Sequence, residues 1–287
     1  MVLGRVRLAR IDDMDRPLHR IFPVWHFERA CRLRQLVLVK PALWIDPRED
    51  PCAMFFLQPQ SGAQRRAGRQ MADYLAACWA QCWSYEADSD VLLRAYSRVV
   101  LDPLIERNTT PAEEGIRVTT TARRLIEAVT VWAEQNASSH FYLAPVIYGP
   151  EDQFDQSLVA QFSRPEGPRF FSTPDGRADS LFVKRDRFGH EQEVRLLCVG
   201  DARLGEGPNI LTFPIDPNSL FTEVAFDPRL IAFERSEREE SLRKCGYTGT
   251  IREDISYVKV LTAIPMKSEW PSPAWDDVES DPSSASS

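Results

Sequence analysis

The segment from residue 191 to residue 200, EQEVRLLCVG, constrains the fold more than any other part of the chain. Successive side chains of a β-strand point to opposite faces of the sheet. One face of this segment is therefore apolar and carries Val194, Leu196 and Cys198. The other face begins with charged side chains, those of Glu191, Glu193 and Arg195. The pattern predicts a core strand with charges gathered at one end.

Two interpretations fit these charges. In the first, they form a structural ion network with Lys184, Arg185 and Arg187, which holds residues 149–178 to the sheet. Exposed ion pairs of this kind contribute only about 0–1 kcal/mol each. The protein would then be a non-catalytic binding or sensor module, in a bacterial stress or anti-phage locus. In the second interpretation, the charges form a functional site.

Length and composition set the frame for either interpretation. The chain has 287 residues, of which 43% are hydrophobic, enough for one large domain or two small ones. We expect a cytoplasmic protein with reduced thiols, because no signal peptide or membrane span is evident and the six cysteines show no disulfide spacing. The net charge of −7 gives no general signal for nucleic-acid binding.

The order of periodic segments predicts a mixed α+β fold. Strands are expected at 18–22 and 35–40, and helices at 24–34, 122–135 and 228–246. A helix is also expected to lead into a short strand near residues 82–84. Residues 149–178 are rich in proline, glycine, serine and aspartate, which indicates a loop excursion. We therefore predict one domain over residues 1–265, followed by a disordered tail at 266–287.

Two further stretches carry candidate site residues. In PALWIDPREDP, Trp44 either fills the core beside an Asp-Pro turn or acts as a stacking platform in a loop that closes over a ligand. In CWSYEADSDVLLRAYS, a strand-to-helix turn brings together Ser84, Arg94 and Tyr96. The alternative there is a capped helix with an aromatic core face. Cys78 and Cys82 lack neighbouring ligands, so we expect packed thiols and no metal site.

Across residues 18–258 the chain resembles a widespread bacterial family known as domain of unknown function number twenty-nine seventy-one. The stretches that carry the resemblance are LVKPALWIDPRED, CWSYEADSDVLLRAYS, GIRVTTTARRL, LFVKRDRFGHEQEVRLL, FDPRL and CGYTGTIREDISYV. The most specific parts are the Asp-Pro loop and the segment around Glu191 and Glu193. The family usually has tryptophan where this chain has Leu93. The resemblance implies no activity.

A looser similarity connects the chain with the ADP-ribosyltransferases, including the members that modify DNA and tRNA. These enzymes place Arg, His or Tyr on a first strand, Ser or Tyr on a later strand, and Glu at the start of a still later strand. Here the corresponding residues are Arg20, Ser84 and Glu193, with Glu191 two residues upstream. The resemblance implies a curved, split mixed sheet with helices outside it, and NAD as the substrate.

The resemblance also implies a role for each residue. Glu193 would hold the ribose 2′-hydroxyl and stabilise the positive charge that develops on the sugar. Glu191 would orient or deprotonate the acceptor, which would be a protein or a nucleic acid. Arg20 would bind the pyrophosphate. The remaining NAD-binding candidates are Ser84, Trp44, Arg94 and Tyr96. The activity would be ADP-ribosyl transfer, or NAD hydrolysis on the same fold, in bacterial stress or anti-phage defence.

Two expectations about geometry follow. The strands of Arg20 and Glu193 should line one groove, and Glu193 should be only partly buried. A third interpretation, contact with nucleic acid, depends on the cations of QRRAGRQ (Arg65, Arg66 and Arg69) and on KRDR. These stretches lack the interleaved aromatic residues that stack on bases.

Overall fold

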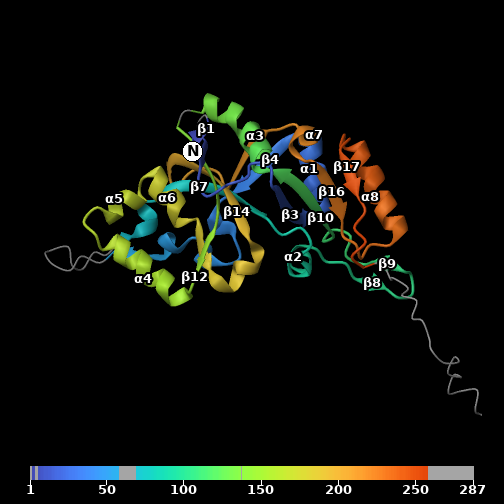
Figure 1. Ribbon diagram of the computed structural model, residues 1–287, viewed down its shortest axis with the longest axis horizontal. Coiled ribbons are helices and arrows are strands. Elements are labelled where there is room, and N and C mark those ends of the chain that lie inside the picture. The colour runs from blue at the N-terminus through green and yellow to red at the C-terminus, as the bar shows by residue number, and fades with distance from the viewer. Residues whose placement is uncertain (1, 4–5, 58–68, 137, 258–287) are drawn as a thin grey trace, which may run out of the picture.

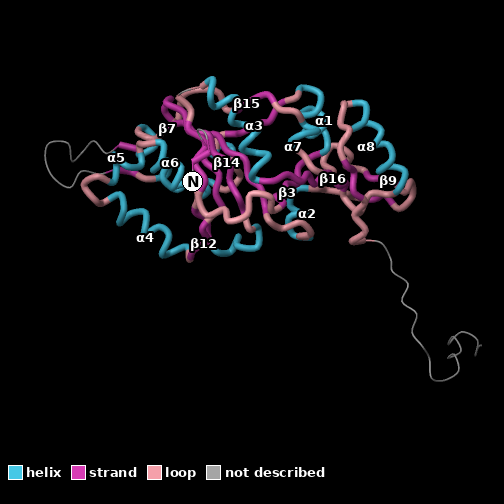
Figure 2. The backbone as a smooth tube through the Cα atoms, turned by 45° about the horizontal axis from the view of Figure 1, so that its top comes forward, coloured by secondary structure: helices cyan, strands magenta, loops and turns pink. Residues whose placement is uncertain are grey.

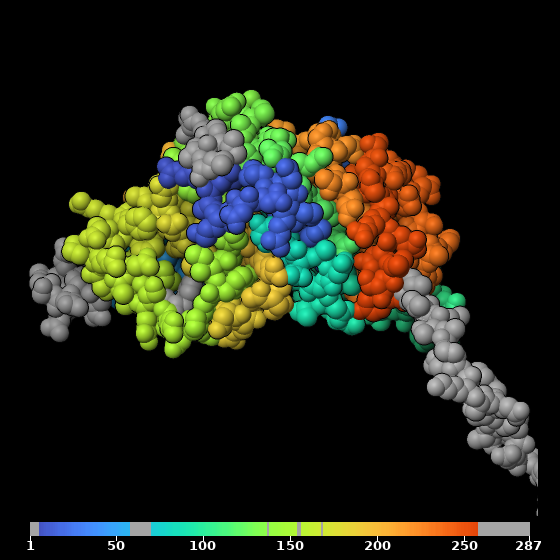
Figure 3. All heavy atoms as spheres, viewed as in Figure 1, coloured from blue at the N-terminus to red at the C-terminus, as the bar shows by residue number. Residues whose placement is uncertain are grey.

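The computed structural model of the chain describes residues 2–3, 6–57, 69–136 and 138–257. A large mixed sheet runs through its centre, and helices lie on both sides of it (Figures 1 and 2). Helices α4, α5 and α6 gather at one end of the molecule, and α8 lies at the opposite end. The space-filling view shows the same separation of these segments on the surface (Figure 3). The predicted α+β class is confirmed.

Within the described residues the central sheet has eleven strands. Nine follow the order β1-β2-β11-β14-β7-β3-β10-β16-β17, and β4 pairs with both β7 and β15. The strands are β1 (Val2–Leu3), β2 (Val6–Leu8), β3 (Pro17–Pro23), β4 (Gln35–Val39), β7 (Ala76–Ser84), β10 (Gly115–Thr121), β11 (His140–Pro145), β14 (Glu193–Arg203), β15 (Ile210–Pro214), β16 (Glu223–Phe226) and β17 (Thr250–Arg252). The pairs β2–β11 and β16–β17 are parallel, and the others are antiparallel.

Shorter elements complete the fold. Three two-stranded pairs are formed by β5 (Phe56–Leu57) with β6 (Arg69–Gln70), β8 (Leu101–Asp102) with β9 (Arg107–Asn108), and β12 (Ile147–Gly149) with β13 (Val183–Arg185). The helices are α1 (Val24–Leu33), α2 (Asp90–Tyr96), α3 (Ala122–Gln135), α4 (Glu151–Phe162), α5 (Gly167–Phe171), α6 (Pro174–Ser180), α7 (Pro217–Leu220) and α8 (Ala232–Lys244). None of the helices in these ranges is long and apolar enough to cross a membrane.

The sheet divides at β7. Strand β3 pairs with β7 only through His19 and Ser84, and β4 pairs with it only through Val39 and Ala80. Beyond these two contacts β3 continues into β10, β16 and β17, whereas β4 continues into β15. The split sheet expected from the sequence is therefore present as two branches that leave β7.

One face of the sheet is covered by α1, α3, α7 and α8. Val194, Leu196 and Cys198 of β14 lie on this face and are 0% exposed, as their alternation predicts. Helix α3 shows why the sequence forms these elements, because Leu125 and Val129 on its buried face are one turn apart. The Thr121 side chain accepts a hydrogen bond from the backbone of Arg124 and begins this helix.

The opposite face of β7 and β14 is covered by α6 and the residues after it. Ala178, Leu181 and Phe182 pack there against Leu197 and Val199 of β14. Glu193 and Arg195 belong to this second face, since they alternate with the apolar residues of the first. Both faces of β14 are therefore buried, and its charged end lies inside the protein.

Residues 149–178 do not form the loop excursion that their composition predicts, because α4, α5 and most of α6 lie there. The polar and small residues begin helices instead of forming a loop. Pro174 stands at the start of α6, and the Thr173 side chain accepts a hydrogen bond from Gly176 N at 3.1 Å.

The expectation of a helix leading into a short strand near 82–84 is also wrong, since β7 begins at Ala76. Buried residues on both faces of β7 remove the alternation that would have indicated a strand. The stretch with Arg65 and Arg66 and the predicted tail at 266–287 lie outside the described residues.

Candidate functional site

Three neighbouring strands bring predicted site residues into one row. Glu193 on β14 pairs with Ser84 on β7, and Ser84 pairs with His19 on β3. Arg20 follows His19 directly. The register thus aligns His19, Ser84 and Glu193 across β3, β7 and β14, with Arg20 one residue further along β3, and we call this place the strand junction.

Glu193 is held by two cations. Its Oε1 accepts a hydrogen bond from Arg195 Nε at 3.0 Å, and its Oε2 accepts from Arg195 Nη2 at 3.1 Å and Lys184 Nζ at 3.2 Å. Burial opposes the charge, but Arg195 and then Lys184 outweigh it and lower the pKa of Glu193 to about 2. Glu193 is 4% exposed, so the expectation of partial burial is wrong. The covering segment around α6 is the physical reason.

Lys184 joins Glu193 to two further carboxylates. Its Nζ lies 2.6 Å from Glu191 Oε2 and 2.8 Å from Glu49 Oε1. Burial raises the pKa of Glu191, and the nearby charges of Glu193 and Glu49 act in the same direction, whereas Lys184 opposes them. Glu191 therefore keeps a proton more readily than an ordinary glutamate.

Arg195 completes the group. It is 0% exposed, pairs with Glu49, and donates from Nη1 to the carbonyl of Leu181 at 2.5 Å. We define the buried ion cluster as these five residues: Glu49, Lys184, Glu191, Glu193 and Arg195. Three carboxylates face two cations, which leaves one net negative charge when all are ionised.

The Asp-Pro loop contributes to this cluster in a different way from the one expected. The Asp46 side chain accepts from Arg48 N at 3.0 Å and begins a short 3₁₀ turn over Pro47–Glu49, which directs Glu49 inward. Trp44 lies 4.9 Å from the Arg195 guanidinium, measured from the ring centroid. Trp44 therefore packs one face of its ring against the cluster.

Ser84 is 8% exposed, and its hydroxyl has two partners. It donates to the carbonyl of Glu191 at 2.5 Å and accepts from the backbone N–H of Glu86 at 2.9 Å. Ser84 thus fixes the turn that carries Glu191 into β14.

Arg20 has an unusual environment. Its Nη1 is buried and has no hydrogen-bond partner among the described residues. Burial lowers the pKa of Arg20, whereas the charges of Cys82, Tyr96 and Glu193 raise it, which places these groups within electrostatic range. In the sheet, Arg20 stands opposite Val118 of β10.

Two more residues belong to this environment. Burial, followed by the charge of Glu191, raises the pKa of Tyr96 to about 12, although the residue is 52% exposed. Burial, followed by the charge of Glu193, raises the pKa of the Cys82 thiol far above its usual range. Both groups stay protonated, so they can donate hydrogen bonds at the strand junction.

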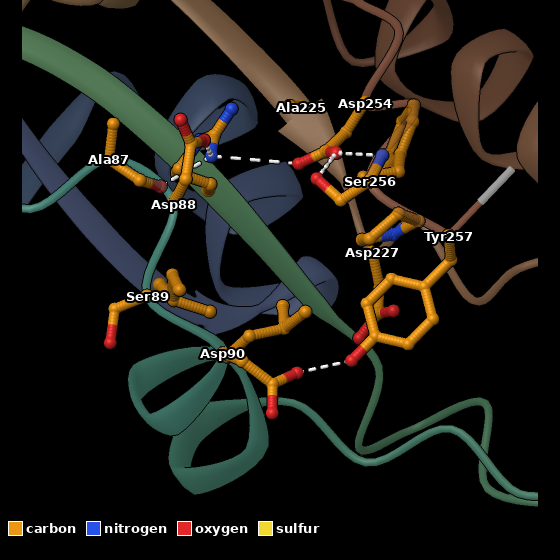
Figure 4. Close-up of a pocket in the computed structure, with 14 residues that line it drawn as sticks. Ala87, Asp88, Ser89, Asp90, Ala225, Asp227, Asp254, Ser256 and Tyr257 are labelled. Carbon is orange, nitrogen blue, oxygen red and sulfur yellow. Dashed lines mark hydrogen bonds and ion pairs between the residues drawn. The ribbon is translucent and has the colours of Figure 1, made fainter.

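Arg94 is not part of this arrangement. It lies on the exposed side of α2, where its Nε is 2.7 Å from Asp90 and its Nη2 is 3.0 Å from the hydroxyl of Tyr257. The adjoining pocket has a volume of about 60 Å³, and Figure 4 shows Asp90 and Tyr257 facing each other at its edge. Leu93 also lines this pocket.

The structure describes two pockets in detail, and neither is lined by Arg20, Ser84 or Glu193. The shared groove expected from the sequence is therefore not among them. Across the described parts of the chain, no group of three or more His, Cys, Asp or Glu side chains is arranged to hold a metal ion.

The sequence interpretation missed two contributors. Glu49 was noticed only as a loop residue, and Cys82 only as a packed thiol. The order Lys184, Glu191, Glu193, Arg195 was visible in the sequence, and its mixed charges were the available signal for the cluster. Nothing in the sequence near Cys82 indicates that its thiol lies beside Glu193.

Comparisons with known proteins give structural neighbours only. No family model matches the chain, and no curated protein matches it significantly. The solved structures that match include Thermus sp. 2.9 DarT in three complexes. With carba-NAD+ the identity is 12%, over 83% of this chain and 95% of that chain, at a TM-score of 0.33. With ADP-ribosylated ssDNA the identity is 12%, over 85% of this chain and 97% of that chain, at a TM-score of 0.34. With NAD+ the identity is 10%, over 84% of this chain and 96% of that chain, at a TM-score of 0.31.

TM-scores of this size carry no argument about the fold or activity of this chain. The ADP-ribosyltransferase-like form of the α+β fold therefore stays a prediction, as does membership of the domain-of-unknown-function family.

Proposed function

We propose that the strand junction binds NAD and that the protein transfers ADP-ribose from it to an acceptor. The observation that supports this most is the buried Nη1 of Arg20, which has no hydrogen-bond partner within the described part of the chain and lies within electrostatic range of Glu193. A buried guanidinium nitrogen without a partner is costly, and a phosphate oxygen of a ligand would satisfy it. The hydroxyl of Tyr96, which stays protonated, adds a hydrogen-bond donor in the same environment.

The two carboxylates at the start of β14 suit different roles. Glu193 has a pKa of about 2 and stays ionised at neutral pH, so it cannot serve as a proton acceptor there. Its fixed negative charge instead suits stabilisation of a cation. Glu191 has a raised pKa, which brings it closer to the value that favours proton transfer at neutral pH.

In the proposed reaction, the bond between nicotinamide and ribose C1′ breaks and its electron pair leaves with neutral nicotinamide. Glu193 stabilises the positive charge that develops on the ribose. A hydroxyl or amine of the acceptor then forms the new bond to C1′, and Glu191 takes its proton. With water as the acceptor, the same bond breaks, water forms the new bond to C1′ and releases its proton to solvent, and NAD is hydrolysed slowly without Glu191.

Nicotinamide release from NAD by the purified protein tests this proposal, with and without cell lysate as the source of acceptor. Glu193→Gln should lower turnover about 10²–10³-fold, because its carboxylate acts as charge develops. Arg20→Gln should weaken NAD binding, and Glu191→Gln should impair transfer while sparing slow hydrolysis. Glu127→Gln, on the exposed side of α3, is the matched control and should change none of these.

A specific observation also favours a second candidate, a binding module whose ion cluster is structural. All five charges of the cluster are paired with one another, and Glu193 is almost completely buried. No nicotinamide release by the wild type, together with no shift in melting temperature on addition of NAD, would favour this candidate over the transferase.

A further inference from the structure

A second pocket, with a volume of about 310 Å³, lies between the Asp-Pro loop, α4 and β13. This volume is at the lower end of the range of about 300–1,000 Å³ that is typical of small-molecule sites. The proposed NAD site does not use it. Glu49 and Lys184 line its inner end, so the pocket adjoins the buried ion cluster from the side of the loop.

The charged wall of the pocket is a network of guanidinium groups and carboxylates. Glu151, the first residue of α4, pairs with Arg48, Arg185 and Arg187. Arg185 also pairs with Asp46. Three guanidinium groups thus share two carboxylates. Arg187 lies outside the pocket lining, and the three cations that line the pocket are balanced by three carboxylates, those of Asp46, Glu49 and Glu151.

Two guanidinium groups of this network are open to a ligand. The side chains of Arg48 and Arg187 are 47% and 56% exposed. Within the described residues, the guanidinium of each has Glu151 as its only hydrogen-bond partner. Each therefore keeps N–H donors that an anion can engage without displacing Glu151. Of the two, Arg48 lines the pocket itself.

The opposite wall is apolar and includes an aromatic ring. Its residues are Pro51, Met54, Phe55 and Val159. The Phe55 ring packs edge-on against Phe162, with the centroids 5.0 Å apart and the planes at 90°. That contact holds the ring in place, and Met54, at 59% exposed, adds a flexible apolar surface beside it.

We propose that this pocket binds an aromatic molecule with one anionic group, of about the size of a nucleoside monophosphate. Its ring packs against Phe55 and Met54, and its anionic group accepts hydrogen bonds from Arg48. The two walls together explain the class of ligand, because the apolar wall selects a ring and the open N–H donors of Arg48 select an anionic acceptor. The site is separate from the strand junction and does not depend on NAD binding there.

Isothermal titration of the full chain with uridine 5′-monophosphate, uridine and inorganic phosphate tests the proposal. This nucleotide lacks both the adenine and the nicotinamide of NAD, so it reports on the pocket. It should bind at least tenfold more tightly than either uridine or phosphate, each of which offers only half of the interaction. The proposal is overturned if the nucleotide does not bind, or if phosphate alone binds as tightly.

Four substitutions locate the site. Arg48→Gln should weaken nucleotide binding about ten- to a hundredfold, because it removes a hydrogen bond to a charged group. Glu151→Gln should strengthen binding, since it frees guanidinium groups and adds positive charge. Arg98→Gln, a matched change at an exposed ion pair with Glu113, should leave affinity unchanged. Loss of binding in Arg20→Gln but not in Arg48→Gln would place the nucleotide at the strand junction and refute the assignment.

Discussion

Replacing Glu193 by glutamine should remove a pH-dependent part of the stability of this protein. The carboxyl of Glu193 has a pKa of about 2 in the folded chain, against an ordinary value of 4.5. One pKa unit corresponds to about 1.4 kcal/mol, so the difference represents about 3 kcal/mol. Since the pKa is lowered by folding, this contribution is present above pH 4.5 and is lost as the pH falls toward 2.

Urea denaturation, followed by tryptophan fluorescence at several pH values from 7 to 3, measures this contribution. At pH 7, Glu193→Gln should unfold with a free energy about 1–3 kcal/mol below that of the wild type. The lower part of this range applies if Arg195 keeps its contacts with Glu49 and the carbonyl of Leu181. The gap between the two proteins should narrow as the pH falls below 4.5, because the Glu193 carboxyl then binds a proton in the unfolded chain while it stays ionised in the folded one.

Glu127→Gln is the control, since its side chain lies on the exposed face of α3 and should show no such change with pH. A gap between Glu193→Gln and the wild type that stays constant from pH 7 to pH 3 would refute the reasoning. Equal stability at pH 7 would refute it as well, because the ion pairs with Arg195 and Lys184 would then contribute nothing measurable.

Three further outcomes are expected. His19 has its pKa lowered to about 4 by burial and then by the charge of Arg117, so NMR titration of its ring should show a midpoint near that value; a midpoint near 6.5 would contradict this. Leu196→Ala should lower the free energy of unfolding by about 2–5 kcal/mol, because the side chain is 0% exposed. A loss below 1 kcal/mol would contradict this and would mean that neighbouring side chains fill the cavity. Asp50→Asn should lower it by about 3–5 kcal/mol in the same urea assay, since it leaves the fully buried guanidinium of Arg177 without its charged partner; unchanged stability would show that the pair is dispensable.

Local patterns predicted those parts of the fold in which one face of an element differs from the other. The alternation in β14 placed Leu196 correctly, and Ser89 indicated the start of α2, where its side chain accepts from Leu92 N. Strand β7 was missed over most of its length because both of its faces are buried. Helices α4 to α6 were missed because short helices with prolines and polar caps have the composition of a loop.

The candidate site was predictable only where its residues are close in sequence. Glu191, Glu193 and Arg195 were expected to act together, and they do lie in one cluster. Their burial could not be predicted, since it depends on the packing of α6 against the sheet. Glu49 is 146 residues away from Arg195, so no local pattern could join them.

The same separation has a consequence for the kinetics of folding. Glu49 meets Lys184 and Arg195 only after a long stretch of intervening chain has been ordered, and closing such a loop has a large entropic cost before the contact forms. The pairs that join the Asp-Pro loop to β13 and β14 are therefore expected to form late, after the transition state has been crossed. Contacts of that kind slow unfolding more than they speed folding. The ion pairs of the Asp-Pro loop are therefore expected to slow unfolding and so to prolong the lifetime of the folded protein.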